Sequence, residues 1–400
     1  MKILFVCQYF YPEVFRGNDI TFHWTEQGHE VHVVSGIPNY PHGKFFEGYG
    51  LFKNRHEVVN GVKVTHLPII PRGNGKITLM LNYFSYLVEA WVWVLFHAVF
   101  HKYDRVFVQQ LSPVMMSAPG VLYKRIQKVP LYTWVLDLWP ESLTAAGGIT
   151  NTYVLAFFRH YVKSQYKHSD KILISSRSFK KSVLEYGDYK NKIAYFPQWS
   201  DGSNGALVQP DNAPIIPDGF KLMFAGAVGE AHGFECTMQA ALKTKDRKDI
   251  KWIIVGDGRK LDWVRNFVKD HELEETVCLL GRYPAETMSW FFQQADVMLV
   301  TLKDDPLFNL YAPAKISSYM AAHKPIVAVL NGEGADVIKD ADCGWTLAAG
   351  DAEGLANLAI ELSQTAKSML EEKGENAVRY YNDHFEKGKC LARLDELMGL

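Results

Sequence analysis

The stretch from Pro306 to Gly334 reads PLFNLYAPAKISSYMAAHKPIVAVLNGEG and combines a turn, a helix, a strand and a glycine loop. The turn ends at Lys315, and a helical pattern follows from Ile316 to Ala322. The apolar run Ile326–Leu330 predicts a buried strand, which ends in the loop 331–334. Because glycines leave backbone N–H groups open to a ligand, the lysine, helix and loop together suit a diphosphate. An ordinary helix–strand unit with a surface lysine would give the same pattern, so both interpretations stay open.

Short apolar runs alternate with helical patterns along the whole chain, which predicts an α/β fold with parallel sheets covered on both faces. The predicted strands are Lys2–Val6, Glu30–Ser35, Val62–Leu67, Arg105–Gln109, Leu131–Leu136, Lys171–Ile174, Ile193–Phe196, Lys221–Phe224, Lys251–Val255, Val277–Leu280, Val297–Val300 and Ile326–Leu330. Residues 201–219 are rich in Pro, Gly, Asp and Asn and predict a linker. We therefore expect two doubly wound domains, 1–200 and 220–377, with a cleft at the carboxyl ends of their strands.

The bulk composition is that of a soluble globular protein. Of the 400 residues, 48% are hydrophobic and 22% are charged, which is ordinary for a folded cytosolic chain. The five cysteines are scattered without a pairing or Cys-x-x-Cys pattern, which favours a reducing compartment and argues against a structural zinc site. Met1 and Lys2 run straight into an apolar stretch too short for a signal peptide, so we expect a cytoplasmic protein.

The charge is divided unevenly between the two halves. Residues 1–200 hold 22 basic and 13 acidic residues, a net charge of +9, whereas residues 201–400 hold 21 and 31, a net charge of −10. The basic half suggests an anionic partner. The basic residues are dispersed and no nucleic-acid-binding motif is present, so no nucleic acid is expected.

The segment Ile77–Phe100 is long and strongly apolar. Polar residues interrupt it at Asn82, Ser85, Glu89 and His97, which argues against a transmembrane span. Two alternatives stay open: a buried helix of the first domain, or a helix whose aromatic face lies in a membrane interface with Arg72 and Lys76 at the headgroups. His97 and His101 have metal-ligand spacing, but no carboxylate partner is evident and no zinc is expected.

Glycine-rich turns follow three predicted strands of the second half, beginning at Gly226, Gly256 and Gly281. If the strands are parallel, these turns and Lys315 share one sheet edge, where backbone N–H groups and helix N-termini can hold phosphate. The candidate donor-binding residues are Gly226, Gly229, Gly256, Arg259, Arg282, Tyr283, Lys315, Ser318, Gly332 and Gly334.

Taken in order, the motifs resemble the GT-B glycosyltransferases of family 4, in particular the L-fucosamine-transferase-like branch of bacterial surface polysaccharide biosynthesis. Besides the turns above, the resemblance rests on Gln8–Glu13, Phe15–Asp19, Gly28–Val31, Gly36–Pro41 and Asp137–Ser142. It implies two Rossmann-like domains facing a central cleft. It also implies that a C-terminal helix, Lys387–Met398 within the segment of about 378–400, crosses back to the first domain.

The resemblance also implies an activity. Such enzymes move a sugar from a nucleotide donor to an acceptor with retained anomeric configuration and without a required metal. The motif Asp340-Ala-Asp342 reads as a surface turn rather than a metal site. The implied donor is a UDP-linked deoxy- or N-acetylamino sugar, and the implied acceptor is a polyprenyl-diphosphate-linked glycan at the inner face of the cytoplasmic membrane. A nucleotide-sugar epimerase and a catalytically silent partner subunit remain as alternatives.

The chain departs from the family pattern at the phosphate site. The family's Arg and Lys positions are Ala227 and His232, and its two Glu positions are Leu310 and Ser318. Because the Pro-Ala-Lys315 turn resembles a variant of the L-fucosamine branch, Lys315 becomes the first candidate for holding the departing diphosphate. Arg259 and Arg282 are reserve cations.

Five further residues are candidates on the sugar and acceptor side. Asp137 follows a predicted buried strand where the family has an acidic or His residue near the sugar, and Glu230 could meet donor-sugar hydroxyls. Arg16, Asn18 and Asp19 follow the first strand. A helix N-cap or turn carboxylate would also explain Asp137, and a position at a helix start would explain Asn18, Asp19 and Glu230 equally well.

Overall fold

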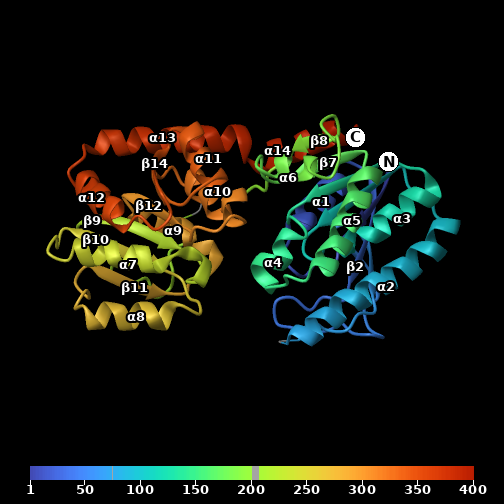
Figure 1. Ribbon diagram of the computed structural model, residues 1–400, viewed down its shortest axis with the longest axis horizontal. Coiled ribbons are helices and arrows are strands. Elements are labelled where there is room, and N and C mark those ends of the chain that lie inside the picture. The colour runs from blue at the N-terminus through green and yellow to red at the C-terminus, as the bar shows by residue number, and fades with distance from the viewer. Residues whose placement is uncertain (74, 201–206) are drawn as a thin grey trace. The chain divides into compact units, whose positions relative to one another are not determined.

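The computed structural model describes residues 1–73, 75–200 and 207–400. Two units separate in the chain: Met1–Phe196 with Leu391–Leu400, and Pro197–Cys390 (Figure 1). The sequence suggested the division at residue 200. Residues 201–206 of the predicted linker lie outside the described residues, and 207–219 contain no helix or strand.

The first unit is built on a sheet with the strand order β3-β4-β2-β1-β5-β6-β7-β8. Its strands are β1 Lys2–Val6, β2 Glu30–Gly36, β3 His56–Val59, β4 Val62–Leu67, β5 Arg105–Gln110, β6 Leu131–Val135, β7 Lys171–Ile174 and β8 Ile193–Tyr195. β1 lies between β2 and β5 in parallel register, and its apolar residues are buried, as expected for a strand covered on both faces. β3 pairs antiparallel with β4.

Helices cover both faces of this sheet (Figure 1). They are α1 Arg16–Glu26, α2 Lys76–Phe100, α3 Ala118–Gln127, α4 Glu141–Gly147, α5 Thr152–His168 and α6 Phe179–Leu184, with the 3-10 turn η1 Val114–Ser117. The 25-residue helix α2 buries one narrow stripe and leaves most of its apolar side chains exposed. The interpretation of this segment as an ordinary buried core helix is therefore wrong.

The second unit is a parallel sheet with the strand order β11-β10-β9-β12-β13-β14. Its strands are β9 Phe220–Ala225, β10 Ile250–Val255, β11 Val277–Gly281, β12 Val297–Thr301, β13 Ile326–Val329 and β14 Gly344–Leu347. The sequence missed β14 here and β3 in the first unit. Both are four-residue edge strands whose side chains are only partly buried, so they lack the continuous apolar run that marks a central strand.

The helices of the second unit also lie on both faces of its sheet (Figure 1). They are α7 Phe234–Lys243, α8 Leu261–Asp270, α9 Met288–Gln294, α10 Ala314–Ala321, α11 Glu333–Ala341, α12 Ala352–Ser363 and α13 Lys367–His384, with 3-10 turns η2 Glu230–His232, η3 Ala285–Thr287 and η4 Phe308–Leu310. The predicted helix of the opening stretch begins at Ala314 rather than Ile316, so Lys315 lies in its first turn. The predicted loop 331–334 is shorter, because α11 begins at Glu333.

The C-terminal helix α14 spans Lys387–Met398, the range that the sequence predicted, and its end returns to the first unit. The carbonyl of Met398 accepts hydrogen bonds from Tyr132 Oη (3.1 Å) and Arg105 Nε (3.3 Å). The return begins later than residue 378, because Tyr381 and Phe385 are buried in the core of the second unit.

Candidate functional site

Three strand-to-helix turns meet at the carboxyl edge of the second unit's sheet. The Gly226 amide donates to Val255 O (2.9 Å), and the Gly256 amide donates to Gly281 O (2.7 Å). Gly256 has a φ of +147°, and a Cβ there would lie 1.9 Å from Gly226 O. A Cβ on Gly258 would lie 2.3 Å from Val228 O. These glycines are therefore required for the turns to approach one another so closely.

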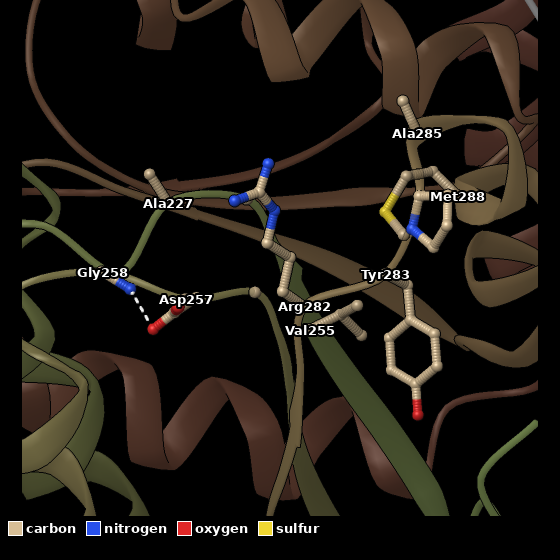
Figure 2. Close-up of a pocket in the computed structure, with 11 residues that line it drawn as sticks. Ala227, Val255, Asp257, Gly258, Arg282, Tyr283, Ala285 and Met288 are labelled. Carbon is tan, nitrogen blue, oxygen red and sulfur yellow. Dashed lines mark hydrogen bonds between the residues drawn. The ribbon is translucent and has the colours of Figure 1, made fainter. Parts of the chain in front are cut away.

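These turns border a cavity of about 870 Å³ (Figure 2). It is lined by Gly226, Ala227, Val255, Gly256, Asp257, Gly258, Arg282, Tyr283, Pro284, Ala285 and Met288. Figure 2 shows the Arg282 side chain extending toward the turn that carries Ala227, with the Tyr283 ring directed away from it. Asp257 Oδ1 accepts a hydrogen bond from the Gly258 amide (2.7 Å). Of the predicted donor-binding residues, Gly226, Gly256, Arg282 and Tyr283 line this cavity.

Lys315 projects from the first turn of α10 toward the turn after β9. Its Nζ lies 3.6 Å from the centroid of the Phe224 ring and 3.3 Å from where a Cβ on Gly226 would stand. It is buried and has no hydrogen-bond partner among the described residues. Burial lowers the pKa of Lys315 from 10.5 to about 7. A buried cation without a hydrogen-bond partner is costly, and an anion bound beside this nitrogen would offset that cost.

His232 faces the same ring from the end of η2. Its imidazole packs edge-on against Phe224, with 5.5 Å between the ring centroids, and its Nδ1 is buried without a hydrogen-bond partner among the described residues. Burial lowers the pKa of His232 to about 4, and the nearby charge of Lys315 adds to the effect. The sequence interpretation counted His232 as a lost cation. The structure places it beside Lys315, as a neutral ring at neutral pH.

Tyr319 positions the helix that carries Lys315 against the end of β9. It lies one helical turn after Lys315, is 1% exposed, and its hydroxyl donates to Ala225 O (2.9 Å) and accepts from Ala225 N (3.0 Å). These two bonds join α10 to the end of β9, directly before Gly226. Sequence reasoning missed Tyr319, whose only signal is a polar aromatic residue on the buried face of a helix.

Glu230 lies in an exposed ion-pair network rather than reaching into the cavity. Its carboxylate pairs with Lys303 (3.1 Å) and Lys260 (3.5 Å), and Lys260 also pairs with Glu235 (2.7 Å). The hydrogen bond from Lys303 lowers the pKa of Glu230. A role toward the donor sugar would require this network to open.

Several predicted donor-side residues lie outside the cavity. Arg259 is exposed and does not line it, although its neighbour Gly258 does. Gly334 is buried, and a Cβ there would lie 2.8 Å from Leu330 Cδ1, so packing explains that glycine. Gly332 has a φ of +70° and is the N-cap residue of α11. A Cβ on Gly332 would collide with the Asn309 carbonyl at 2.0 Å.

The remaining donor-side predictions are explained by local structure too. Ser318 is a half-buried residue of α10, and Gly229 precedes η2, beside His232 rather than in the cavity. The reserve role of Arg259 and the open-amide interpretation of Gly334 are therefore not supported by where the structure places them.

In the first unit, Asp137 follows β6 and is half-buried. Burial raises the pKa of Asp137, and hydrogen bonds from the side chain and backbone of Ser112 oppose that shift. Ser112 Oγ also accepts from Trp139 Nε1 (3.0 Å). The carboxylate therefore has a local partner in Ser112, and its role near the sugar stays a prediction.

The three predicted residues at the start of α1 make local contacts. Arg16 pairs with Asp19 (3.3 Å) at the start of α1. Asn18 Nδ2 donates to Glu13 O (2.8 Å), while its Oδ1 is buried without a partner among the described residues. Burial raises the pKa of Glu13 to about 7, although backbone amides of Asn39, Tyr40 and Phe10 donate to its carboxylate.

A cluster around Arg72 was only partly foreseen. The Arg72 guanidinium donates a hydrogen bond to Tyr9 Oη (3.1 Å). It lies 5.3 Å from the centroid of the Tyr40 ring and 6.0 Å from the centroid of the Tyr83 ring. Tyr9 lies in the segment between β1 and α1, and Tyr83 is in α2. This half-buried cation is thus held by tyrosine rings and the Tyr9 hydroxyl, contacts that leave the guanidinium charged.

No group of three or more His, Cys, Asp or Glu side chains that could hold a metal ion occurs within residues 1–73, 75–200 and 207–400. Asp342 of the Asp340-Ala-Asp342 motif pairs with Lys373 at the end of α11. His97 and His101 stack ring on ring at 4.0 Å, and His97 Nε2 contacts Tyr103 Oη at 2.8 Å.

Residues 219–365 match the family described as "Glycosyl transferases group 1". The chain is 29% identical over 254 residues to "Probable glycosyltransferase WbjE" of Pseudomonas aeruginosa, covering 60% of this chain and 62% of that protein. It is 25% identical over 250 residues to "Putative colanic acid biosynthesis glycosyl transferase WcaI" of Escherichia coli, covering 58% of this chain and 59% of that protein. The chain thus spans about 60% of the length of these relatives.

A solved structure of the Anabaena protein HepE in complex with UDP superposes on all of this chain and all of that chain, with a TM-score of 0.69 and 15% identity. At this identity the likeness concerns the fold alone. It confirms the predicted fold class: two Rossmann-like units of the GT-B type.

Proposed function

We propose that this chain, whose residues 219–365 match the group 1 glycosyl transferase family and whose units have the GT-B fold, transfers a sugar from a nucleoside diphosphate donor. The observation that carries the proposal is the Lys315 ammonium. Its Nζ is buried without a hydrogen-bond partner among the described residues, at the glycine turn after β9 and beside a cavity of about 870 Å³. The diphosphate would meet Lys315 and the Gly226 turn, and the nucleoside would occupy the cavity between Arg282 and Met288.

The chemistry follows from charge. As the C1–O bond of the donor sugar breaks, negative charge grows on the departing diphosphate, and Lys315 lies where it can stabilise that charge. The neutral His232 ring can donate one hydrogen bond from Nδ1 to a phosphate oxygen. We propose that the acceptor hydroxyl forms the new C1–O bond on the same face and passes its proton to the leaving diphosphate. The anomeric configuration is then retained, and no metal is required.

The acceptor side of the proposal is a polyprenyl-diphosphate-linked glycan in surface polysaccharide assembly, at the cytoplasmic face of the membrane. It is supported by the relatives, one of which is named for colanic acid biosynthesis, and by the net charge of +9 of residues 1–200. We propose a UDP-linked deoxy- or N-acetylamino sugar as donor. The Pro-Ala-Lys315 turn supports the narrower assignment to the L-fucosamine-transferase-like branch.

The direct test is UDP binding, measured by thermal shift and calorimetry on the full chain. Lys315→Met keeps the length of the side chain but removes its charge, so UDP affinity should fall about ten- to hundredfold, as for one lost charge-assisted hydrogen bond. Lys339→Met changes an exposed lysine of α11 and should leave affinity unchanged. Equal UDP affinity in wild type and Lys315→Met would refute the assignment.

Two alternatives give different products. A nucleotide-sugar epimerase would convert UDP-sugars without an acceptor, so epimerised donor in an acceptor-free incubation would favour it.

The replacement of the family's cationic and acidic positions by Ala227, His232, Leu310 and Ser318 motivates a catalytically silent subunit. In that case Lys315→Ala would leave polysaccharide output unchanged, whereas transferase activity predicts a loss of about 2–4 kcal/mol of transition-state stabilisation.

A further inference from the structure

Helix α2 exposes a row of large apolar side chains to solvent on the side turned away from the sheet. Six of them are 61–80% exposed and define the α2 apolar face: Ile77, Met80, Phe84, Phe96, Val99 and Phe100. At about 1.5 Å per residue, the 25-residue helix carries this face over about 37 Å. An apolar surface of this length is unusual on a soluble chain and marks an interaction site.

The opposite side of α2 is fastened to the core of the first unit. Asn82, Tyr86, Ala90, Val94 and Ala98, at every fourth position, are at most 1% exposed. Tyr86 Oη donates to Cys7 O (2.9 Å), and Asn82 Oδ1 accepts from Gln8 Nε2 (2.7 Å), both at the end of β1. Although Ile77–Phe100 is long and apolar enough to cross a membrane, with a mean hydropathy of 1.4, crossing would break these bonds and empty the core. The helix can only meet a membrane lying along its surface.

The charges around α2 favour an anionic lipid surface over another protein. Glu89 is the sole acidic residue in the helix sequence, and it interacts electrostatically with Arg55. Arg72 precedes the helix, and Lys102 follows it. Cations at both ends of an apolar helix face are typical of helices that lie in the headgroup region.

We propose that α2 is an in-plane membrane helix, whose apolar face enters the headgroup–acyl boundary of a bilayer containing anionic lipid. This inference rests on the proposed function only for its purpose, which is to hold the first unit at the surface that carries a lipid-linked acceptor. Arg72, held among Tyr9, Tyr40 and Tyr83 at the amino end of α2, then lies where it can meet the phosphate of that lipid.

Flotation of the full chain with vesicles of phosphatidylglycerol and phosphatidylcholine tests the proposal. Wild type should float, and less protein should float with phosphatidylcholine alone. The double variant Phe84→Glu with Phe96→Glu should reduce partitioning of the protein into the vesicles about tenfold or more. The two aromatic side chains that would be buried in the bilayer are then replaced by carboxylates that stay in water. The matched control Phe52→Glu changes a loop residue of the same unit that is 97% exposed, and it should stay within about twofold of wild type. Unfolding midpoints would show that all variants fold.

Two results would overturn the inference. The inference is wrong if wild-type protein stays in the soluble fraction and does not float with the vesicles. A concentration-dependent dimer abolished by Phe84→Glu and Phe96→Glu, without vesicle binding, would assign the face to a second copy of the chain instead. UDP thermal shifts measured in parallel separate this question from the proposed function: a UDP shift without flotation overturns only the membrane proposal, and flotation without a UDP shift overturns only the donor proposal.

Discussion

At the scale of single residues, the state of Lys315 predicts a pH signature of donor binding. In the ligand-free protein, burial holds the pKa of Lys315 at about 7, so at pH 8 the amine is mostly neutral. A bound diphosphate favours the ammonium form and raises this pKa again. UDP binding at pH 8 should therefore take up most of one proton, and affinity should fall as the pH rises above 7.

Calorimetry in two buffers of different ionisation enthalpy measures that proton uptake. Lys315→Met should abolish the uptake as well as weaken binding, whereas Lys339→Met should change neither. Binding of the same strength at pH 6 and pH 9, with no buffer dependence, would show that the diphosphate does not contact Lys315.

Arg72 gives a second prediction at this scale. Because tyrosine rings and the Tyr9 hydroxyl hold its guanidinium, Arg72→Gln should leave the fold and UDP binding intact. Phosphate contact through arginine is worth about 1.5–3 kcal/mol. The KM for a lipid-diphosphate acceptor should therefore rise about tenfold or more, with little change for an acceptor lacking phosphate. Similar KM changes for both acceptors would point to a structural role of Arg72.

At the scale of elements, the contact between α10 and the end of β9 depends on two hydrogen bonds of Tyr319. Tyr319→Phe keeps the buried ring but leaves the amide and carbonyl of Ala225 without that partner, at a cost of about 1–3 kcal/mol in the free energy of unfolding. Because Lys315 lies one turn earlier on the same helix, UDP affinity should fall too. Urea unfolding and calorimetry measure the two effects; a loss of stability with unchanged UDP affinity would show that Lys315 is positioned without Tyr319.

The central elements could be predicted from the sequence because burial on both faces leaves a continuous apolar run, as in β1 and β13. The edge strands β3 and β14 could not, since half-exposed four-residue strands carry no such signal. Lys315 was recognisable from its motif, but its lack of a hydrogen-bond partner among the described residues was not, because that depends on how α10 packs against Phe224 and Gly226 at the end of β9. Likewise, the exposed side of α2 could not be told from a core face until the stripe from Asn82 to Ala98 was placed.

At the scale of the whole molecule, α14 ties the end of the chain to its first helix. Asp395 accepts hydrogen bonds from Trp24 Nε1 (2.8 Å) and contacts His23 Nε2 (2.7 Å). Trp24 is fully buried. Asp395→Ala would therefore leave a buried indole N–H without this acceptor and should destabilise the first unit by about 1–3 kcal/mol.

The second unit holds its own core and the cavity that we propose binds the donor, so UDP binding should survive in Asp395→Ala while the first unit unfolds at lower temperature. Scanning calorimetry with and without UDP resolves this, because UDP raises only the transition of the unit that binds it. Glu396→Ala, at an exposed neighbouring position, is the matched control and should unfold like wild type. A single transition that shifts as a whole in Asp395→Ala would mean that the two units unfold together, and α14 would then be the element that couples them.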